Sequence, residues 1–124
     1  MSKIYEHKKI IFIAIIIIII FVFIIKNKEK NAPASTLDEF AKCLTQKGII
    51  MYGTFWCPHC QNQKTKFEDS FKYITYIECT INFKICTNAG VNGLPTWILS
   101  NGQKLEGEQT LEKLSEQSNC PLKQ

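Results

Sequence analysis

The chain has 124 residues, 45% of them hydrophobic, and a formal net charge of +4 at pH 7. This length allows one small domain with an appendage. The lysines are scattered rather than clustered, so the sequence gives no support for nucleic-acid binding. Six cysteines in so short a chain predict a compartment where disulfides persist, such as the periplasm or a lumen, rather than a reducing cytosol.

One run of the chain, residues 10–25, has no polar side chain. As a helix it would span roughly 24 Å, a little less than a hydrocarbon core, with Lys8 and Lys26 able to reach the interfaces from either end. The run therefore predicts a transmembrane helix. The alternative is a cleaved signal peptide with Ala32-Pro33-Ala34 as its cleavage site, but charged residues separate that site from the apolar run.

These features predict four segments along the chain. Residues 1–9 form a short cytosolic N-terminus, 10–25 a retained signal anchor, 26–35 a linker and 36–124 a folded domain. Lysines flank the apolar run equally on both sides, so the positive-inside rule does not fix its orientation. The cysteine content does, and it predicts a folded domain in the periplasm or another extracytoplasmic space.

Hydrophobic periodicity predicts the elements of that domain in chain order. Thr36-Leu37-Asp38-Glu39 is a capping box in which Thr36 caps a helix that ends at Gly48. The expected elements after it are strand 49–55, a helix from Cys57 to about Ser70, strand 73–78, a short helix 82–89, a hairpin 96–99 and 103–105 with an Asn-Gly turn, and helix 110–117. The strand-helix-strand order requires the first two strands to be parallel.

The motif Cys57-Pro58-His59-Cys60 lies where the first strand turns into a helix. A cysteine at a helix N-terminus meets unpaired N–H groups and the positive end of the dipole, which stabilise a thiolate. Cys57 is therefore the predicted nucleophile, and Cys60, one turn later, the predicted resolving thiol. Pro58 suits the first helical turn, and we assign it a redox-tuning role together with His59.

Metal binding is the alternative reading of the same cysteines, because a lone C-x-x-C is often half of a zinc site. Cys57, His59, Cys60, Cys79 and Cys86 are the side chains available as ligands. The second pair has C-x6-C spacing, which is wider than the tight knuckle of a zinc ribbon. We therefore favour redox chemistry and expect no metal, with a merely structural Cys57–Cys60 disulfide as the third reading.

Trp56 and the two motif cysteines at a strand-helix junction, with Leu94-Pro95-Thr96 before a hairpin, resemble the thioredoxin fold. The resemblance implies an α/β domain with a four-stranded mixed sheet flanked by helices. Together with Met51-Tyr52-Gly53, residues 76–79 and residues 107–109, these motifs most closely resemble the thioredoxin-like domain fused to vitamin K epoxide reductase homologues in bacteria and plants. The match covers about residues 36–119.

Several site roles follow from this resemblance. It implies that Cys57 attacks, that Cys60 resolves, and that Pro95 is a cis-proline which, with Trp56 and Leu94, binds the substrate peptide. Thioredoxins also keep a buried acid six residues before the first cysteine, and Met51 stands there in this chain. The sequence leaves water and Glu78 as candidates for handling the proton of Cys60.

The resemblance also implies partners. Such domains exchange disulfides with protein thiols without a cofactor of their own, and a membrane enzyme passes the electrons to a quinone. This chain has only one apolar run, so we expect a separate membrane partner, similar to vitamin K epoxide reductase or to DsbB. The tetrapeptide Cys-Pro-His-Cys also occurs in DsbA, which favours an oxidant. A disulfide reductase or isomerase, and a metallochaperone that uses Cys57 and Cys60, are the alternatives.

The remaining four cysteines raise two questions of pairing. Cys79 and Cys86 lie close in sequence, at the end of the second strand and in the next helix, and we expect them to form a disulfide. Cys43 and Cys120 are harder to pair, because the first and last helices are expected on opposite faces of the sheet. The even number of cysteines favours that bridge and the topology disfavours it.

Overall fold

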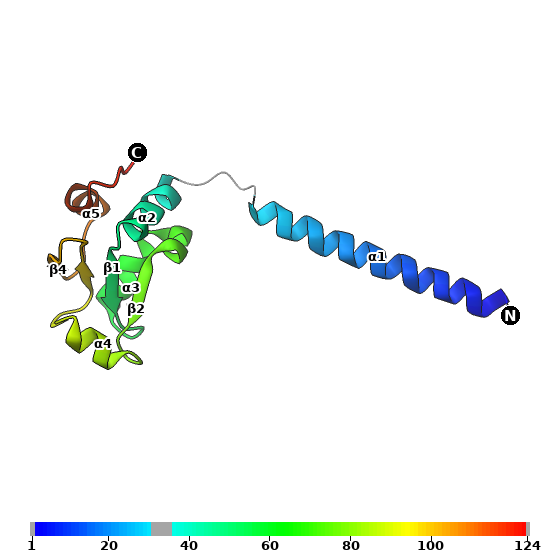
Figure 1. Ribbon diagram of the computed structural model, residues 1–124, viewed down its shortest axis with the longest axis horizontal. Coiled ribbons are helices and arrows are strands. Elements are labelled where there is room, and N and C mark those ends of the chain that lie inside the picture. The colour runs from blue at the N-terminus through cyan, green and yellow to red at the C-terminus, as the bar shows by residue number, and fades with distance from the viewer. Residues whose placement is uncertain (1, 31–35, 124) are drawn as a thin grey trace. The chain divides into compact units, whose positions relative to one another are not determined.

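A computed structural model describes residues 2–30 and 36–123 of the chain (Figure 1). It divides into two compact units, Met1–Pro33 and Ala34–Gln124, which we describe separately. Residues 31–35, which hold most of the expected linker and the alternative cleavage site, lie outside the described residues.

The first unit contains one helix, α1, which spans Ser2–Lys30. Within it, Glu6–Ile24 is a stretch of 19 residues that is long and apolar enough to cross a membrane. The side chains of this stretch are exposed throughout. Length and composition therefore fit the expected membrane anchor, although a signal sequence near the N-terminus meets the same criterion.

The second unit is built on a four-stranded sheet with the order β2-β1-β3-β4. The strands are β1 (Ile50–Gly53), β2 (Thr75–Glu78), β3 (Thr96–Ile98) and β4 (Lys104–Glu106). Strands β1 and β2 are parallel, whereas β1 with β3 and β3 with β4 are antiparallel. The expected mixed sheet and the parallel first pair are both confirmed.

The helices of this unit follow the predicted order. They are α2 (Thr36–Gln46), α3 (Pro58–Thr65), the 3-10 helix η1 (Glu68–Tyr73), α4 (Phe83–Asn88) and α5 (Leu111–Ser118) (Figure 1). The helix expected to run from Cys57 to about Ser70 is in fact two pieces: α3 ends at Thr65, and the positive φ of Glu68, 50°, keeps the α-helix from continuing into η1. Thr36 is the first helical residue rather than the cap, and the residue before it lies outside the described part.

The two faces of the sheet have separate cores. Met51 pairs with Trp97 across β1 and β3, and this face packs against buried side chains of α2, α3, η1 and α5, including Phe40, Cys60 and Leu114. Tyr52, on the opposite face, packs with Cys79 and Cys86 near α4. The expectation that the first and last helices cover opposite faces was therefore wrong, since α2 and α5 share a face.

This shared face brings Cys43 and Cys120 together. They form a disulfide with an S–S distance of 2.04 Å and a Cα–Cα distance of 5.8 Å. Helix α5 ends at Asn119, whose left-handed conformation, with φ of 54°, turns the chain back. Lys47 then donates from Nζ to the carbonyls of Ser118 and Asn119, at 2.7 and 3.0 Å. The C-terminal segment thus reaches α2 without passing around an edge of the sheet.

A second disulfide joins Cys79, just after β2, to Cys86 in α4. Its Cα–Cα distance is 5.8 Å, which is within the range that a disulfide spans. Both sulfurs belong to the smaller core on the α4 face. The structure therefore leaves Cys57 and Cys60 as its two free thiols.

Candidate dithiol site

The two free thiols lie at the start of α3. Cys57 is the residue before the helix and has extended backbone angles, φ −79° and ψ 119°, while Pro58 is the first helical residue. This arrangement follows from the sequence, because proline is well tolerated where the first helical N–H groups have no partner. Cys57 is 7% exposed and Cys60 is fully buried, so one thiol borders the surface and the other lies behind it.

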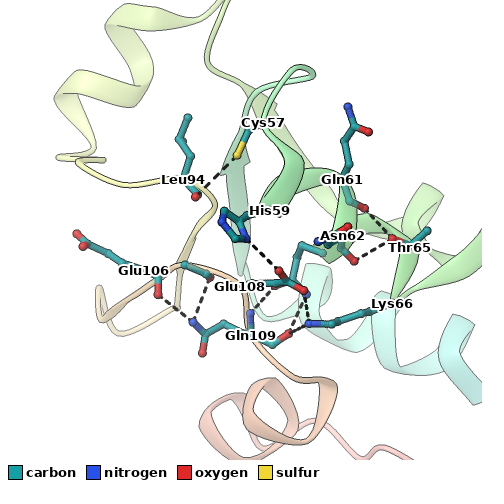
Figure 2. Close-up of polar contacts among 12 residues, drawn as sticks. Cys57, His59, Gln61, Asn62, Thr65, Lys66, Leu94, Glu106, Glu108 and Gln109 are labelled. Carbon is teal, nitrogen blue, oxygen red and sulfur yellow. Dashed lines mark hydrogen bonds and ion pairs between the residues drawn. The ribbon is translucent and has the colours of Figure 1, made fainter.

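The loop before β3 lies against Cys57. The Leu94–Pro95 peptide bond is cis, and the Sγ of Cys57 donates to the carbonyl oxygen of Leu94 at 3.9 Å (Figure 2). Trp56, next to Cys57, is 61% exposed. The structure thus brings together the thiols, the cis-proline loop and the aromatic residue that the sequence analysis placed at one site.

Cys60 is held in a tight space beneath Cys57. A Cβ built on Gly53, at the end of β1, would lie 2.9 Å from the Sγ of Cys60, so glycine is needed there. Burial raises the pKa of Cys60 to about 11, and the neighbouring Cys57 adds to the shift. The backbone N–H of Thr54 and the charge of Lys64 act in the opposite direction but are outweighed. Cys60 is therefore a protonated thiol at neutral pH.

His59 points away from the sheet toward the loop before α5. Its Nδ1 lies 3.3 Å from Oε2 of Glu108, and Nζ of Lys66 lies 2.6 Å from the other carboxylate oxygen (Figure 2). Hydrogen bonds from Lys66 and then His59 hold the pKa of the Glu108 carboxyl below its usual value. Glu108, which is itself paired with Lys66, therefore positions His59, the side chain to which we assigned redox tuning.

The loop that carries Glu108 is fixed to α3 by a buried amide. Gln63 is fully buried; its Nε2 donates to the carbonyl of Gln109 at 3.1 Å and its Oε1 accepts from the N–H of Gln109 at 2.6 Å. The sequence analysis did not identify Gln63, Lys66 or Glu108 as site residues. One signal in the sequence could have identified Gln63: it is a polar residue one helical turn after Cys60, and so on the same buried face of the helix.

A cavity of about 360 Å³ is lined by Trp56 and Leu94, the neighbours of Cys57 in the chain and in the cis-proline loop. It lies between the cis-proline loop, the residues around Trp56 and helix α4. The described residues that line it are all uncharged: Thr54, Trp56, Cys79, Thr80, Phe83, Cys86, Thr87, Val91, Asn92 and Leu94. Trp56 and Phe83 are mostly exposed, at 61% and 74%. The lining therefore suits an uncharged side chain, and Leu94 joins this cavity to Cys57, which does not itself line it.

The metal alternative depends on a cluster of ligands. Among residues 2–30 and 36–123, no group of three or more His, Cys, Asp or Glu side chains is placed to hold an ion. Cys79 and Cys86, two of the side chains considered as ligands, are joined to each other in a disulfide.

A fully buried thiol behind one that borders the surface, at a helix N-terminus and beside a cis-proline, defines a thioredoxin-like protein with a dithiol site. The thioredoxin family model matches residues 31–119 of this chain. That segment is well over half of the chain, so the chain belongs to the thioredoxin family.

Comparison with characterised proteins gives a plant relative. Over 93 residues the chain is 40% identical to the thiol-disulfide oxidoreductase LTO1 of Arabidopsis thaliana. The aligned segment is 68% of this chain and 24% of that protein. This chain therefore spans about a quarter of the length of its relative.

Proposed function

We propose that this protein is a thiol-disulfide oxidoreductase that exchanges disulfides with protein substrates. The observation that carries the proposal is the pairing of a nearly buried Cys57, held against the Leu94 carbonyl beside a cis-proline, with the fully buried Cys60 behind it. The thioredoxin family match and the name of the plant relative support the same chemistry.

The exchange would proceed in two displacements. A substrate thiolate attacks Sγ of Cys57 in the oxidised protein, which breaks the Cys57–Cys60 bond and forms a mixed disulfide, while Cys60 leaves and takes up a proton. A second substrate thiolate then attacks the substrate sulfur of the mixed disulfide and releases Cys57. The substrate loses two electrons and gains a disulfide, and the protein ends as a dithiol. Reduction of a substrate is the same path in reverse.

We propose oxidation as the physiological direction. The support is the Cys-Pro-His-Cys tetrapeptide, which also occurs in DsbA, at the start of α3, since stabilising the reduced form makes a disulfide a stronger oxidant. The presence of two further disulfides in the same unit fits an oxidising compartment. The extracytoplasmic location and the membrane anchor α1 are part of this proposal.

Reoxidation would then require a partner. The resemblance to domains fused to vitamin K epoxide reductase homologues suggests a separate membrane enzyme of that kind, or one similar to DsbB, which passes electrons to a quinone. The plant relative is about four times as long as the segment it shares with this chain, so most of that protein lies outside the shared segment.

The reduction potential of the Cys57–Cys60 pair tests this direction. Equilibration with glutathione buffers, followed by alkylation and mass analysis, should give a value nearer to DsbA, about −120 mV, than to thioredoxin, about −270 mV. A value near that of thioredoxin would overturn the oxidant and favour a reductase. Cys57→Ser is the control, because it should abolish exchange while both structural disulfides remain.

A further inference from the structure

Strand β1, which packs against Cys60, offers no acceptor for the proton of this thiol. Cys60 is fully buried, and Met51, at the position where an acid would be useful, is fully buried and apolar. An acid is present on the adjacent strand instead. Glu78 pairs with Gly53 in the parallel register of β1 and β2, and Gly53 is the residue against which the Cys60 sulfur packs.

Tyr76 connects this acid to the space in which the thiol lies. A Cβ built on Gly53 would lie 2.9 Å from Sγ of Cys60 and 3.3 Å from the hydroxyl oxygen of Tyr76, so both atoms border the space that glycine leaves open. The same hydroxyl donates to Oε2 of Glu78 at 2.7 Å. Because the hydroxyl proton is directed at Glu78, the lone pairs of the oxygen are free to accept a proton from elsewhere.

Glu78 connects this pair to the surface. Its Oε1 accepts from the hydroxyl and the N–H of Thr80, at 2.7 and 3.2 Å, and Thr80 is exposed. Burial raises the pKa of the Glu78 carboxyl, but hydrogen bonds from Thr80 and Tyr76 outweigh it and leave the pKa below the usual value. Glu78 is thus a carboxylate at neutral pH. Burial, followed by the hydrogen bond to Glu78, raises the pKa of Tyr76, so Tyr76 passes a proton on without remaining ionised.

We propose that Tyr76 and Glu78 form the proton relay of Cys60. The inference rests on the proposed exchange activity. When Cys60 attacks the mixed disulfide at Cys57, its S–H proton moves to the Tyr76 oxygen as the Tyr76 proton moves to Glu78, which releases it to water. The new Cys57–Cys60 bond forms, and the substrate sulfur leaves as a thiolate. In the opposite direction the relay returns a proton to Cys60 as it leaves.

The other charged groups around Cys60 do not offer this route. Lys64, on the same helix, lies 3.8 Å above the Tyr76 ring and carries a positive charge, so it stabilises an anion but accepts no proton. Cys57 is part of the disulfide during the step. On β1, Met51 and Gly53 have no titratable side chain, which leaves Tyr76 and Glu78 on β2.

The test follows the two half-reactions separately. The reduced protein is mixed with an aromatic disulfide that releases coloured thionitrobenzoate; attack by Cys57 releases the first equivalent and attack by Cys60 on the mixed disulfide releases the second. Glu78→Gln and Tyr76→Phe should each leave the rate of the first phase unchanged and slow the second phase by at least about tenfold at neutral pH. This factor is smaller than the rate acceleration that general acid-base catalysis usually contributes. Glu112→Gln, an exposed change on α5, is the control.

The pH profile distinguishes a relay from a packing effect. As the pH approaches about 11, the pKa of Cys60, the thiol ionises without a base, so the second-phase rates of both variants should converge on the wild-type rate. An unchanged second phase in either variant, or a slowdown that persists at high pH, would overturn the relay. If the unmodified protein shows no first phase, the exchange activity itself fails, which is a different result.

Discussion

Gly53 is the residue that makes room for the resolving thiol. A side chain at this position would meet the Cys60 sulfur at 2.9 Å and the Tyr76 ring at 3.2 Å. We expect Gly53→Ala to destabilise the reduced protein by about 1 to 3 kcal/mol, as overpacking of a core does. Urea unfolding of the reduced domain measures this, with both structural disulfides kept intact.

Gly93→Ala provides the matched control for this substitution. A Cβ on Gly93 would meet only the Glu106 side chain, and at an ordinary distance of 3.7 Å. Its unfolding midpoint should therefore change much less. Equal losses in the two variants would show that the effect comes from glycine itself and not from the contact with Cys60.

Glu108 gives a prediction about pH at the residue scale. Its carboxyl has a pKa lowered from 4.5 by Lys66 and His59, so the contact contributes stability that is full above about pH 4.5 and is lost as the pH falls through the lowered value. The difference in urea midpoint between wild type and Glu108→Gln should be constant at neutral pH and shrink in acid below 4.5. A difference that grows on acidification would contradict the assignment.

Among the elements, the link between α2 and the end of α5 is the one with most effect on stability. The Cys43–Cys120 bridge closes a loop with a sequence separation of 77, whereas Cys79 and Cys86 are separated by 7. On the chain-entropy account, removing them costs about 4.5 and about 2.5 kcal/mol, respectively. Denaturant unfolding of the two Cys-to-Ala double variants, without reductant, should therefore rank the long-loop variant as the less stable. The reverse order would show that native-state packing outweighs loop closure.

The helices and strands also show which parts of the fold could be predicted from the sequence. The strands, the hairpin and the position of the dithiol at a helix start follow from local patterns, which depend on a few neighbouring residues. The pattern of α2 shows that Phe40 and Leu44 are buried, but an apolar stripe does not say which face of a sheet it covers. The prediction for Cys43 and Cys120 depended on that choice and was wrong about the faces.

Long-range contacts place the site residues that local patterns could not. The sequence left Glu78 as one of two candidates for the proton of Cys60 and did not identify Tyr76. Both residues come near Cys60 through the register of β1 with β2, and a change of one residue would turn both side chains to the other face. Likewise, Glu108 reaches His59 across 49 positions of sequence. No local pattern encodes such pairs, whereas Cys57 and Cys60 are recognisable from their spacing alone.

On the scale of the whole molecule, the folded unit exposes several large apolar side chains. Phe55, Trp56, Ile81, Phe83 and Ile85 are at least half exposed. Trp56 and Phe83 also line the uncharged cavity, and exposed apolar surface commonly marks an interaction site. It fits unfolded protein segments or a membrane-bound partner better than small charged thiols.

Substrate selectivity therefore gives a further prediction. Two cysteine peptides that differ only in a residue next to the cysteine, one with leucine and one with aspartate, should be oxidised at different rates, with the leucine peptide faster by about tenfold, as for a buried apolar side chain. Phe83→Ser should reduce the difference, because it removes an apolar wall of the cavity. Equal rates for both peptides in the wild type would show that the cavity does not take part in recognition.

The two units together give a prediction about where the molecule is located. A helix able to cross a membrane precedes a unit with two disulfides, so we expect export through the membrane with α1 retained. In a bacterial host, the full chain should fractionate with membranes, keep its N-terminal residues by mass analysis and carry Cys43–Cys120 in the oxidised form. A mature N-terminus near Ala34 would instead identify a cleaved signal peptide. Ile17→Lys with Ile18→Lys, which breaks the apolar stretch at its centre, should leave the chain in the cytosol with all its cysteines reduced; oxidised Cys43 and Cys120 in that variant would separate disulfide formation from export.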